Sequence, residues 1–280
     1  MIGCVKYKTN LLLFKKRIKN LNYISSLENK LFKEIMSLKV RKNRYKSKLY
    51  LIEGIRFVEE AIKNNCEINY VIISESKKDY IIDRFNFKDG LFNVIVFSDE
   101  LFEKVKQTEK TQGIIACLKI RDTFKKFDFN EGIYFLIDKI QDPGNLGTII
   151  RTAVAVNALG IILIKGSVDI YNDKVLRSTM GSIFKININF IESYLELNEF
   201  IENDFKLVIA DAYSDNNYYH VDLKGKIILA IGNEGNGISD EVKNFPHIKV
   251  RIPMCNDLES LNVAQALSII AFERVRQLDI

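Results

Sequence analysis

The chain has 280 residues, of which 47% are hydrophobic and 28% charged, a composition typical of a soluble globular protein with room for two domains. No apolar run approaches the roughly 20 residues that a membrane-spanning helix needs. The four cysteines lie far apart and only two histidines are present, so the sequence predicts a cytoplasmic protein with reduced thiols, no membrane contact and no metal site.

The net charge of +5 conceals an asymmetry between the start of the chain and the rest. Residues 1–50 contain 14 Lys and Arg against 2 Asp and Glu, which leaves the other 230 residues with a balance of −7. Tyrosine and phenylalanine side chains are interleaved with these positive charges. Such a segment is typical of nucleic-acid binding. The alternative is a solubilising tail.

The first half of the chain predicts a basic arm followed by a small α/β domain. Residues 1–23 are basic and weakly periodic, so we expect a loosely attached arm there. Residues 24–118 alternate between helical and extended patterns. The expected strands are 49–52, 70–73, 94–97 and 113–118, and the expected helices are a first one ending near residue 39, then 55–64, 77–85 and 99–106.

Five basic residues lie within the nine positions 40–48, directly after the first expected helix. We expect a turn there that contacts phosphate groups. The alternative is a solvated helix end. The candidate RNA-binding residues in this segment are Arg41, Lys42, Arg44 and Lys46.

The second half predicts a larger α/β domain. Residues 119–131 are charged and aperiodic and are expected to be a linker to a domain over 132–280. The alternating pattern that follows predicts a mainly parallel sheet with helices on both faces. The expected strands are 133–137, 161–164, 186–190, 207–210, 227–231 and 248–252, and the expected helices are 146–158, 173–183, 194–202, 239–244 and 260–277.

A strand, a turn and a helix open this second domain. Pro143 and Gly144 mark the turn after the apolar run 133–137, and Asn145 is expected to cap a helix that carries Arg151. Asn145 would then lie at the carboxyl end of a strand, where open α/β sheets keep their sites. Taken alone, the segment fits a βα turn with a surface arginine equally well.

Two later segments also combine glycine with polar residues. Residues 229–239 read Leu-Ala-Ile-Gly-Asn-Glu-Gly-Asn-Gly-Ile-Ser. The glycine spacing is not that of a dinucleotide-binding loop, which disfavours a nicotinamide enzyme. Residues 251–254 read Arg-Ile-Pro-Met, and residues 259–264 read Glu-Ser-Leu-Asn-Val-Ala. Asn262 opens the terminal helix, where it serves as a cap, as an active-site group, or as both.

Together these three blocks resemble, in the same order, the three motifs of the SpoU/TrmH family of RNA ribose 2′-O-methyltransferases, in the SPOUT class. The resemblance implies a trefoil-knotted C-terminal domain preceded by a small L30e-like α/β domain that binds RNA. It implies a homodimer that uses S-adenosylmethionine to methylate a ribose 2′-hydroxyl in 23S ribosomal RNA, with transfer RNA as the alternative. A non-catalytic RNA-binding protein with the same fold is the rival interpretation.

The resemblance also assigns roles to residues. Arg151 stands in the position of the family's catalytic arginine. A guanidinium group has a pKa above ~12 and no acceptor atom, so we expect Arg151 to bind the adjacent phosphate and stabilise negative charge rather than act as a base. The expected supporting residues are Asn145, Glu234, Ser260 and Asn262, and the expected methyl-donor pocket consists of Ile231, Gly232, Ile252, Met254, Leu261 and Asn262.

Two further positions follow from the family pattern. Arg177 lies in another family-like stretch and is expected to contact RNA or the dimer mate, with a solvated helix residue as the alternative. Asn256 stands where the family has glycine, two residues after the Ile-Pro-Met motif. Because asparagine tolerates a left-handed backbone better than most residues, we expect the loop to keep its shape.

Overall fold

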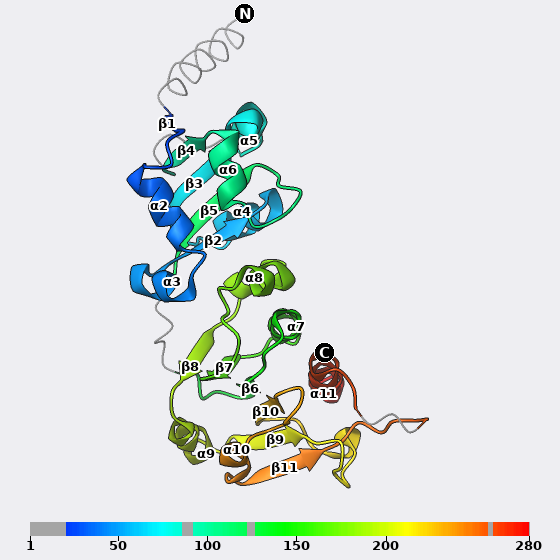
Figure 1. Ribbon diagram of the computed structural model, residues 1–280. Coiled ribbons are helices and arrows are strands. Elements are labelled where there is room, and N and C mark those ends of the chain that lie inside the picture. Colours follow the sequence, from blue (N-terminus) through cyan, green and yellow to red (C-terminus); the bar gives the residue numbers. More distant parts are fainter. Residues whose placement is uncertain (1–20, 86–91, 122–126, 257–259, 280) are drawn as a thin grey trace, which may run out of the picture. The chain divides into compact units, whose positions relative to one another are not determined.

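The computed structural model describes residues 21–85, 92–121, 127–256 and 260–279 (Figure 1). The chain divides into two compact units, residues 1–120 and 121–280. Most of the expected N-terminal arm lies outside the described residues. None of the helices in the described ranges is long and apolar enough to cross a membrane.

A five-stranded mixed sheet forms the first unit, with strand order β1-β4-β3-β5-β2. Strands β1, β4 and β3 are parallel, whereas β5 runs antiparallel to β3 and β2. The strands are β1 (Asn22–Ile24), β2 (Leu49–Glu53), β3 (Ile68–Ser74), β4 (Val94–Phe97) and β5 (Ile114–Lys119). The helices are α2 (Lys30–Ser37), α3 (Arg41–Ser47), α4 (Ile55–Lys63), the 3-10 helix η2 (Glu75–Lys77), α5 (Lys78–Phe85) and α6 (Asp99–Val105).

Two elements of this unit differ from the sequence-based expectation. Strand β1 begins in the last two residues of the segment expected to be an arm and ends at the first residue of the expected domain; its three residues are too few for periodicity to reveal a strand. The basic segment expected to be a turn forms helix α3, which ends at Lys48 in a left-handed conformation (φ 55°). The helix forms because its seven residues include no proline or glycine, and such residues are compatible with a helix once a neighbouring core holds them.

The second unit is built on a six-stranded sheet in which every strand pair is parallel, with order β11-β9-β10-β6-β7-β8. This confirms the predicted mainly parallel sheet. The strands are β6 (Gly132–Asp138), β7 (Gly160–Ile164), β8 (Ile188–Ile191), β9 (Lys206–Ala210), β10 (Lys226–Gly232) and β11 (His247–Val250). All carboxyl ends therefore share one edge, and the direction of winding reverses between β6 and β10, where open α/β sheets place their binding sites.

Helices cover this sheet on both faces (Figure 1). Helix α11 packs against α7 and β10, while the opposite face holds an aromatic cluster in which Phe200 contacts Tyr134 and Phe205 at ring-centroid distances of 5.2 and 5.5 Å. The helices are α7 (Pro143–Ala155), α8 (Asp173–Thr179), η3 (Ser182–Phe184), η4 (Tyr194–Leu197), α9 (Asn198–Glu202), η5 (Tyr218–His220), α10 (Asp240–Lys243) and α11 (Val263–Gln277).

The helix expected over residues 173–183 ends early. Met180 and Gly181 both adopt positive φ, of 50° and 88°, which stops α8 and begins η3. The trefoil knot implied by the resemblance stays a prediction.

Candidate active site

Helix α7 begins one turn earlier than expected. Asp142, not Asn145, is the N-cap: its Oδ1 accepts a hydrogen bond from the Asn145 N–H at 2.8 Å. The prediction that Asn145 caps the helix is therefore wrong. Pro143 occupies the first helical position, which its fixed φ favours, so the cap must precede it. The Asn145 side chain is consequently available for contacts outside its own helix.

The Asn145 amide joins the three sequence motifs. Its Nδ2 donates to Oε1 of Glu234 at 2.9 Å, and its Oδ1 accepts from Nδ2 of Asn262 at 2.9 Å. These residues are 89 and 117 positions away along the chain. Three of the predicted supporting residues thus meet beside the switch point of the sheet.

Asn262 is both a cap and a member of this cluster. Its Oδ1 accepts from the backbone N–H groups of Ala264 and Gln265, at 3.0 and 3.3 Å, and so begins helix α11. Because these bonds occupy the oxygen, the amide nitrogen must face Asn145. Both roles expected of Asn262 are therefore compatible with the geometry.

Glu234 lies against the start of helix α7. Its carboxylate accepts from the N–H of Gln141 at 3.4 Å and of Asp142 at 3.3 Å, as well as from Asn145. Partial burial by itself raises the pKa of Glu234, but these hydrogen bonds, with one from its own backbone N–H, outweigh burial and lower the pKa below its ordinary value. Glu234 is therefore an anion at neutral pH.

The loop that presents Glu234 folds back on itself. Asn233 and Gly237 exchange two backbone hydrogen bonds, of 3.0 and 2.9 Å. A Cβ atom on Gly232 would lie only 2.1 Å from the carbonyl carbon of Gly237, so this position requires glycine. The Asn233 amide also donates to the carbonyl oxygen of Lys139 at 3.0 Å, which fixes the start of the loop.

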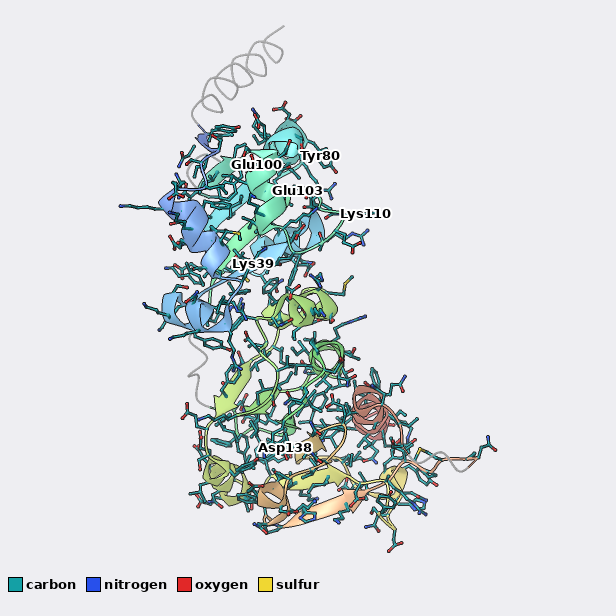
Figure 2. All side chains as sticks on the ribbon, viewed as in Figure 1. Lys39, Tyr80, Glu100, Glu103, Lys110 and Asp138 are labelled. Carbon is teal, nitrogen blue, oxygen red and sulfur yellow. The ribbon has the colours of Figure 1, made fainter. Side chains whose placement is uncertain are left out.

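A buried carboxylate fixes the other end of the same loop. Asp138, the last residue of β6, is labelled in Figure 2 and is 1% exposed. Its Oδ2 accepts from the N–H of Ser239 at 2.7 Å, and its Oδ1 accepts from the hydroxyl of Tyr194 at 3.3 Å. The loop from Gly232 to Ser239 is thus held at both ends by two consecutive residues, Asp138 at the end of β6 and Lys139 directly after it.

A cavity of about 400 Å³ lies beside this loop, at the carboxyl ends of β9, β10 and β11. Every residue of the predicted donor pocket lines it, as do Glu234 and Ser260. The sequence-based prediction missed the wall formed by residues 210–212 and Arg251. Residues 210–212 lie at the carboxyl end of an expected strand, β9. A strand that lies next to β10 has its carboxyl end at the same pocket, so these residues could have been predicted to line it.

Asp211 supplies a fixed charge to that wall. Its side chain pairs with Nζ of Lys249 at 3.0 Å and accepts from the N–H of Tyr213 at 2.9 Å. Burial raises the pKa of Asp211, but the Tyr213 hydrogen bond and the Lys249 charge outweigh it and lower the pKa. Among the described residues, the cavity lining includes two carboxylate side chains, Asp211 and Glu234, and the guanidinium side chain of Arg251.

Arg151 stands apart from this cluster. It is exposed on α7, in one stripe with Gly144, Thr148 and Ala155, and does not line the cavity. Helix α7 is itself held in place, since Thr152 shares a hydrogen bond with Ser268 of α11 at 2.8 Å. The structure thus brings Asn145, Glu234 and Asn262 together, with Ser260 on the cavity wall, and leaves Arg151 facing outward.

The predicted RNA-binding residues of α3 differ in exposure. Arg41 lies over the Tyr45 ring at 5.6 Å, and Lys42 and Lys46 are exposed. Arg44 is 7% exposed, and its Nη1 donates to the carbonyl oxygens that end α2, at 2.8 and 3.0 Å. The expectation that Arg44 contacts RNA is therefore corrected, because its guanidinium is committed to the fold.

The structure also shows the ion pair of Arg177 and the backbone conformation of Asn256. Arg177 pairs with Asp173 one turn earlier on α8, at 2.8 Å. Asn256 adopts the left-handed conformation, with φ 60°, as expected for a residue in place of glycine. In the described part of the chain, no group of three or more His, Cys, Asp or Glu side chains is placed to hold a metal ion.

Two family models match the chain. Residues 132–272 match the SpoU rRNA Methylase family, and residues 29–116 match the MRM3-like substrate binding domain. The first match alone spans half of the chain. The chain therefore belongs to the SpoU rRNA methylase family.

Named relatives agree over nearly the whole length. The chain is 31% identical over 251 residues to the 23S rRNA (guanosine(2553)-2′-O)-methyltransferase RlmP of Bacillus subtilis, covering 89% of this chain and 97% of the relative. It is 27% identical over 246 residues to the 23S rRNA (uridine(2479)-2′-O)-methyltransferase of Streptomyces viridochromogenes, covering 85% and 86% of the two chains.

Solved structures share the fold. The SpoU methyltransferase AviRb of Streptomyces viridochromogenes, in complex with the cofactor AdoMet, aligns with a TM-score of 0.82 at 25% identity over 90% of this chain and 99% of that one. An AdoMet-bound rRNA methyltransferase from Sinorhizobium meliloti aligns with a TM-score of 0.77 at 27% identity, over 92% and 98% of the two chains.

Proposed function

We propose that this RNA methyltransferase transfers the methyl group of S-adenosylmethionine to a ribose 2′-hydroxyl of 23S ribosomal RNA. The observation that carries the proposal is the meeting of all three family motifs at the Asn145 amide, beside a cavity lined by all six predicted donor-pocket residues. Relatives named for 2′-O-methylation of 23S rRNA support the substrate. A ribosomal RNA substrate in turn supports a cytoplasmic location.

The cavity suits this methyl donor in size and chemistry. Apolar side chains of Ile231, Ile252 and Leu261 offer a surface for a nucleobase. Carboxylates and a guanidinium in the same wall complement a ligand that carries both an amino group and a carboxylate. When bound, S-adenosylmethionine supplies an electrophilic methyl group.

We assign different tasks to the predicted catalytic residues. Asn145, Glu234 and Asn262 fix the start of α7 and the loop beside the cavity, and Ser260 contributes to the cavity wall. Arg151, on the exposed stripe of α7, binds the phosphate next to the target ribose and stabilises the charge that develops on the 2′-oxygen. The 2′-hydroxyl proton leaves to a phosphate oxygen or to water.

We propose that residues 24–118 bind the RNA, that residues 119–131 link the domains, and that residues 132–280 carry catalysis in a homodimer. The match of residues 29–116 to a substrate binding domain supports the first part, with Arg41, Lys42 and Lys46 as phosphate contacts. Two apolar side chains exposed on α11, Ile269 and Phe272, support dimerisation.

The test is methyl transfer from labelled S-adenosylmethionine to unmodified 23S rRNA by the parent and by Arg151→Ala. We expect label in ribose, and a loss of kcat/KM of about 100-fold or more in the variant. Melting temperature should stay the same, because Arg151 is exposed. Lys224→Ala, which removes another exposed positive charge from the same unit, should keep full activity.

Two results would contradict the assignment. Failure of the parent to methylate any RNA, despite binding both RNA and S-adenosylmethionine, would support a non-catalytic RNA-binding protein. Full activity of Arg151→Ala would remove the assigned role of the arginine while leaving the reaction in place.

A further inference from the structure

Residues 211–225, between β9 and β10, carry an exposed aromatic side chain that is not part of the Asn145, Glu234 and Asn262 cluster. Tyr213 is 90% exposed, more than any other large hydrophobic residue of the described chain. A single exposed apolar side chain needs no explanation in general. The backbone beneath this ring, however, is fixed by hydrogen bonds to strand β11 and the residue after it.

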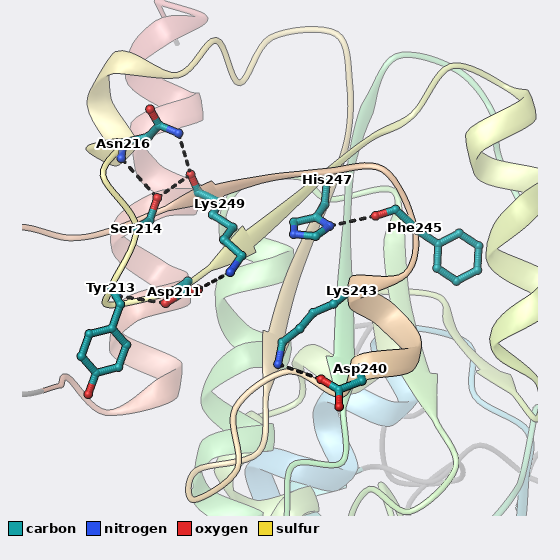
Figure 3. A network of polar contacts seen from close by, with 9 residues as sticks. All are labelled: Asp211, Tyr213, Ser214, Asn216, Asp240, Lys243, Phe245, His247 and Lys249. Carbon is teal, nitrogen blue, oxygen red and sulfur yellow. Dashed lines mark hydrogen bonds and ion pairs between the residues drawn. The ribbon is translucent and has the colours of Figure 1, made fainter.

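The segment that begins with Tyr213 is tied to strand β11 (Figure 3). The Tyr213 N–H donates to Asp211, whose carboxylate also pairs with Lys249. The Ser214 hydroxyl donates to the carbonyl oxygen of Lys249 at 2.9 Å, and the N–H of Asn216 donates to that hydroxyl at 3.2 Å. Tyr213 is therefore held between anchored residues while its ring points away from this network, as Figure 3 shows.

The rest of the segment is held as firmly. Arg251 donates its N–H to the Asn216 carbonyl oxygen at 2.8 Å and accepts from the Tyr218 N–H at 2.9 Å, so the segment extends the sheet edge past β11. Further along, Gln277 of α11 accepts from the N–H of Leu223 at 2.8 Å. A backbone fixed in this way loses little conformational entropy when a partner binds to its side chains.

The Tyr213 ring has no aromatic neighbour among the described residues, although its segment contains other rings. Tyr219 lies 5.2 Å from Tyr218 and 4.5 Å from His220, in edge-on contacts. Asn217 donates to the Tyr219 hydroxyl at 2.9 Å. These rings pack against one another, whereas both faces of the highly exposed Tyr213 ring are open to a partner.

The location points to the substrate of the methyl transfer. Asp211 and Ala212 line the donor cavity, and Tyr213 follows them directly in the chain, so its backbone lies next to the cavity lining. Residues 211–225 contain three aspartates and one other fully charged side chain, Lys224, so this surface does not attract phosphate groups by charge. Stacking between an aromatic side chain and a nucleobase needs no such charge.

We infer that Tyr213 is a stacking platform for an unpaired nucleobase of the RNA, at the rim of the donor cavity. The inference rests on the proposed function, because it names how the same substrate is held near the reacting centre. Phosphate contacts by the N-terminal domain position the RNA backbone but do not contact its bases. A fixed ring beside the cavity adds a local contact that orients the strand at the site of transfer.

The experiment compares the parent with Tyr213→Ala and Tyr213→Phe, and uses Leu195→Ala as a control that removes another exposed apolar side chain of the same unit. The probes are a 23S rRNA transcript and a single-stranded oligoribonucleotide, the latter also annealed to its complement. We expect Tyr213→Ala to raise the Kd and KM for RNA on the order of tenfold. Tyr213→Phe and Leu195→Ala should stay within about twofold of the parent, because stacking requires only the ring.

Two accompanying readouts define the expected specificity. The loss should appear with single-stranded RNA and be absent with the duplex, whose bases are not free to stack on the ring. The Kd for S-adenosylmethionine and the melting temperature should not change.

Three outcomes would overturn the inference, and a fourth would overturn the proposed function alone. If Tyr213→Ala binds RNA like the parent and methylation is intact, Tyr213 is not a stacking platform, while the proposed function stands. Weaker binding of S-adenosylmethionine would assign the ring to the donor pocket, and conversion to monomers would assign it to a second copy of the chain. If no protein methylates RNA but Tyr213→Ala still loses affinity for single strands, the proposed function fails and the platform stands.

Discussion

The negative charge of Glu234 is stabilised by hydrogen bonds at the start of helix α7. Its carboxylate accepts hydrogen bonds from Asn145 and from the N–H groups of Gln141 and Asp142. Donors at the start of a helix favour an anion there, which agrees with the lowered pKa of Glu234. The contribution of this carboxylate to the free energy of unfolding therefore depends on pH.

Replacing Glu234 by glutamine should show this dependence. Because the pKa of Glu234 is lower in the folded state, its contribution to the free energy of unfolding is fully present above the unfolded-state pKa of about 4.3 and is lost as pH falls through the folded-state value. The parent should exceed Glu234→Gln in stability at pH 6–8, by less than about 1 kcal/mol because the side chain is exposed to solvent.

The measurement is urea unfolding of both proteins at pH 7 and at pH 3.5. The difference between them should shrink at the lower pH, and a difference that grows would contradict the lowered pKa. Arg151→Ala, which leaves these hydrogen bonds intact, should show no such change with pH.

Single residues also mark the limit of sequence-based prediction. All six residues that the family resemblance assigns to the donor pocket line one cavity. Local cap propensity predicts Asn145 as the helix cap, since a favoured cap residue precedes an apolar period, whereas Asp142 is the better candidate because Pro143 follows it. Asp211 carries no motif and became visible only through the position of its strand.

The turn between β10 and α10 leaves no room for a side chain at Gly232. A methyl group on Gly232 would overlap the backbone of Gly237 and Ile238 at 2.1–2.3 Å, and backbone atoms cannot move aside as a flexible side chain does. We expect Gly232→Ala to displace the loop and weaken binding of S-adenosylmethionine about tenfold or more. It should also lower stability by roughly 1–3 kcal/mol.

Gly235 offers a matched control in the same turn. A Cβ atom there would meet only Oδ1 of Asn233, at 3.6 Å, which is ordinary van der Waals contact. Gly235→Ala should therefore bind the donor like the parent. Calorimetric titration with S-adenosylmethionine decides the matter, and equal loss in both variants would show that the turn needs glycine for flexibility rather than for the close approach at Gly232.

Buried, continuously apolar strands are predicted correctly from the sequence, whereas a very short strand and a polar helix are not. Strands β6 and β7 were predicted because they are continuous apolar runs, and all five residues of β7 are buried. Strand β1 and helix α3 were missed because their identity comes from neighbours: β1 is a three-residue strand paired with β4, and α3 is polar along its length. Tertiary contacts, which local periodicity does not encode, decide such elements.

At the scale of the whole molecule, the two compact units correspond to two separate family matches, residues 29–116 and 132–272. The alternation of strands and helices indicated two α/β domains, yet it contained no information about a second copy of the chain. The homodimer is a proposal, and the outer surface of α11 is where it can be tested. Ile269 is 37% exposed and Phe272 is 50% exposed, three residues apart and thus on one side of the helix.

If α11 forms the contact between two copies, a charge at its centre should separate them. In Phe272→Glu, two-fold symmetry would bring two carboxylates into an apolar interface, and we expect the dimer Kd to rise about 100-fold or more. Leu195→Glu is the control, because Leu195 is 72% exposed on η4 and the same charge there should leave the dimer intact.

Sedimentation across a range of protein concentrations distinguishes the three proteins. A parent that stays monomeric at every concentration would refute the homodimer, whereas a dimeric Phe272→Glu would place the contact on another surface. Methyl transfer by the dissociated variant then reports whether one subunit suffices for catalysis.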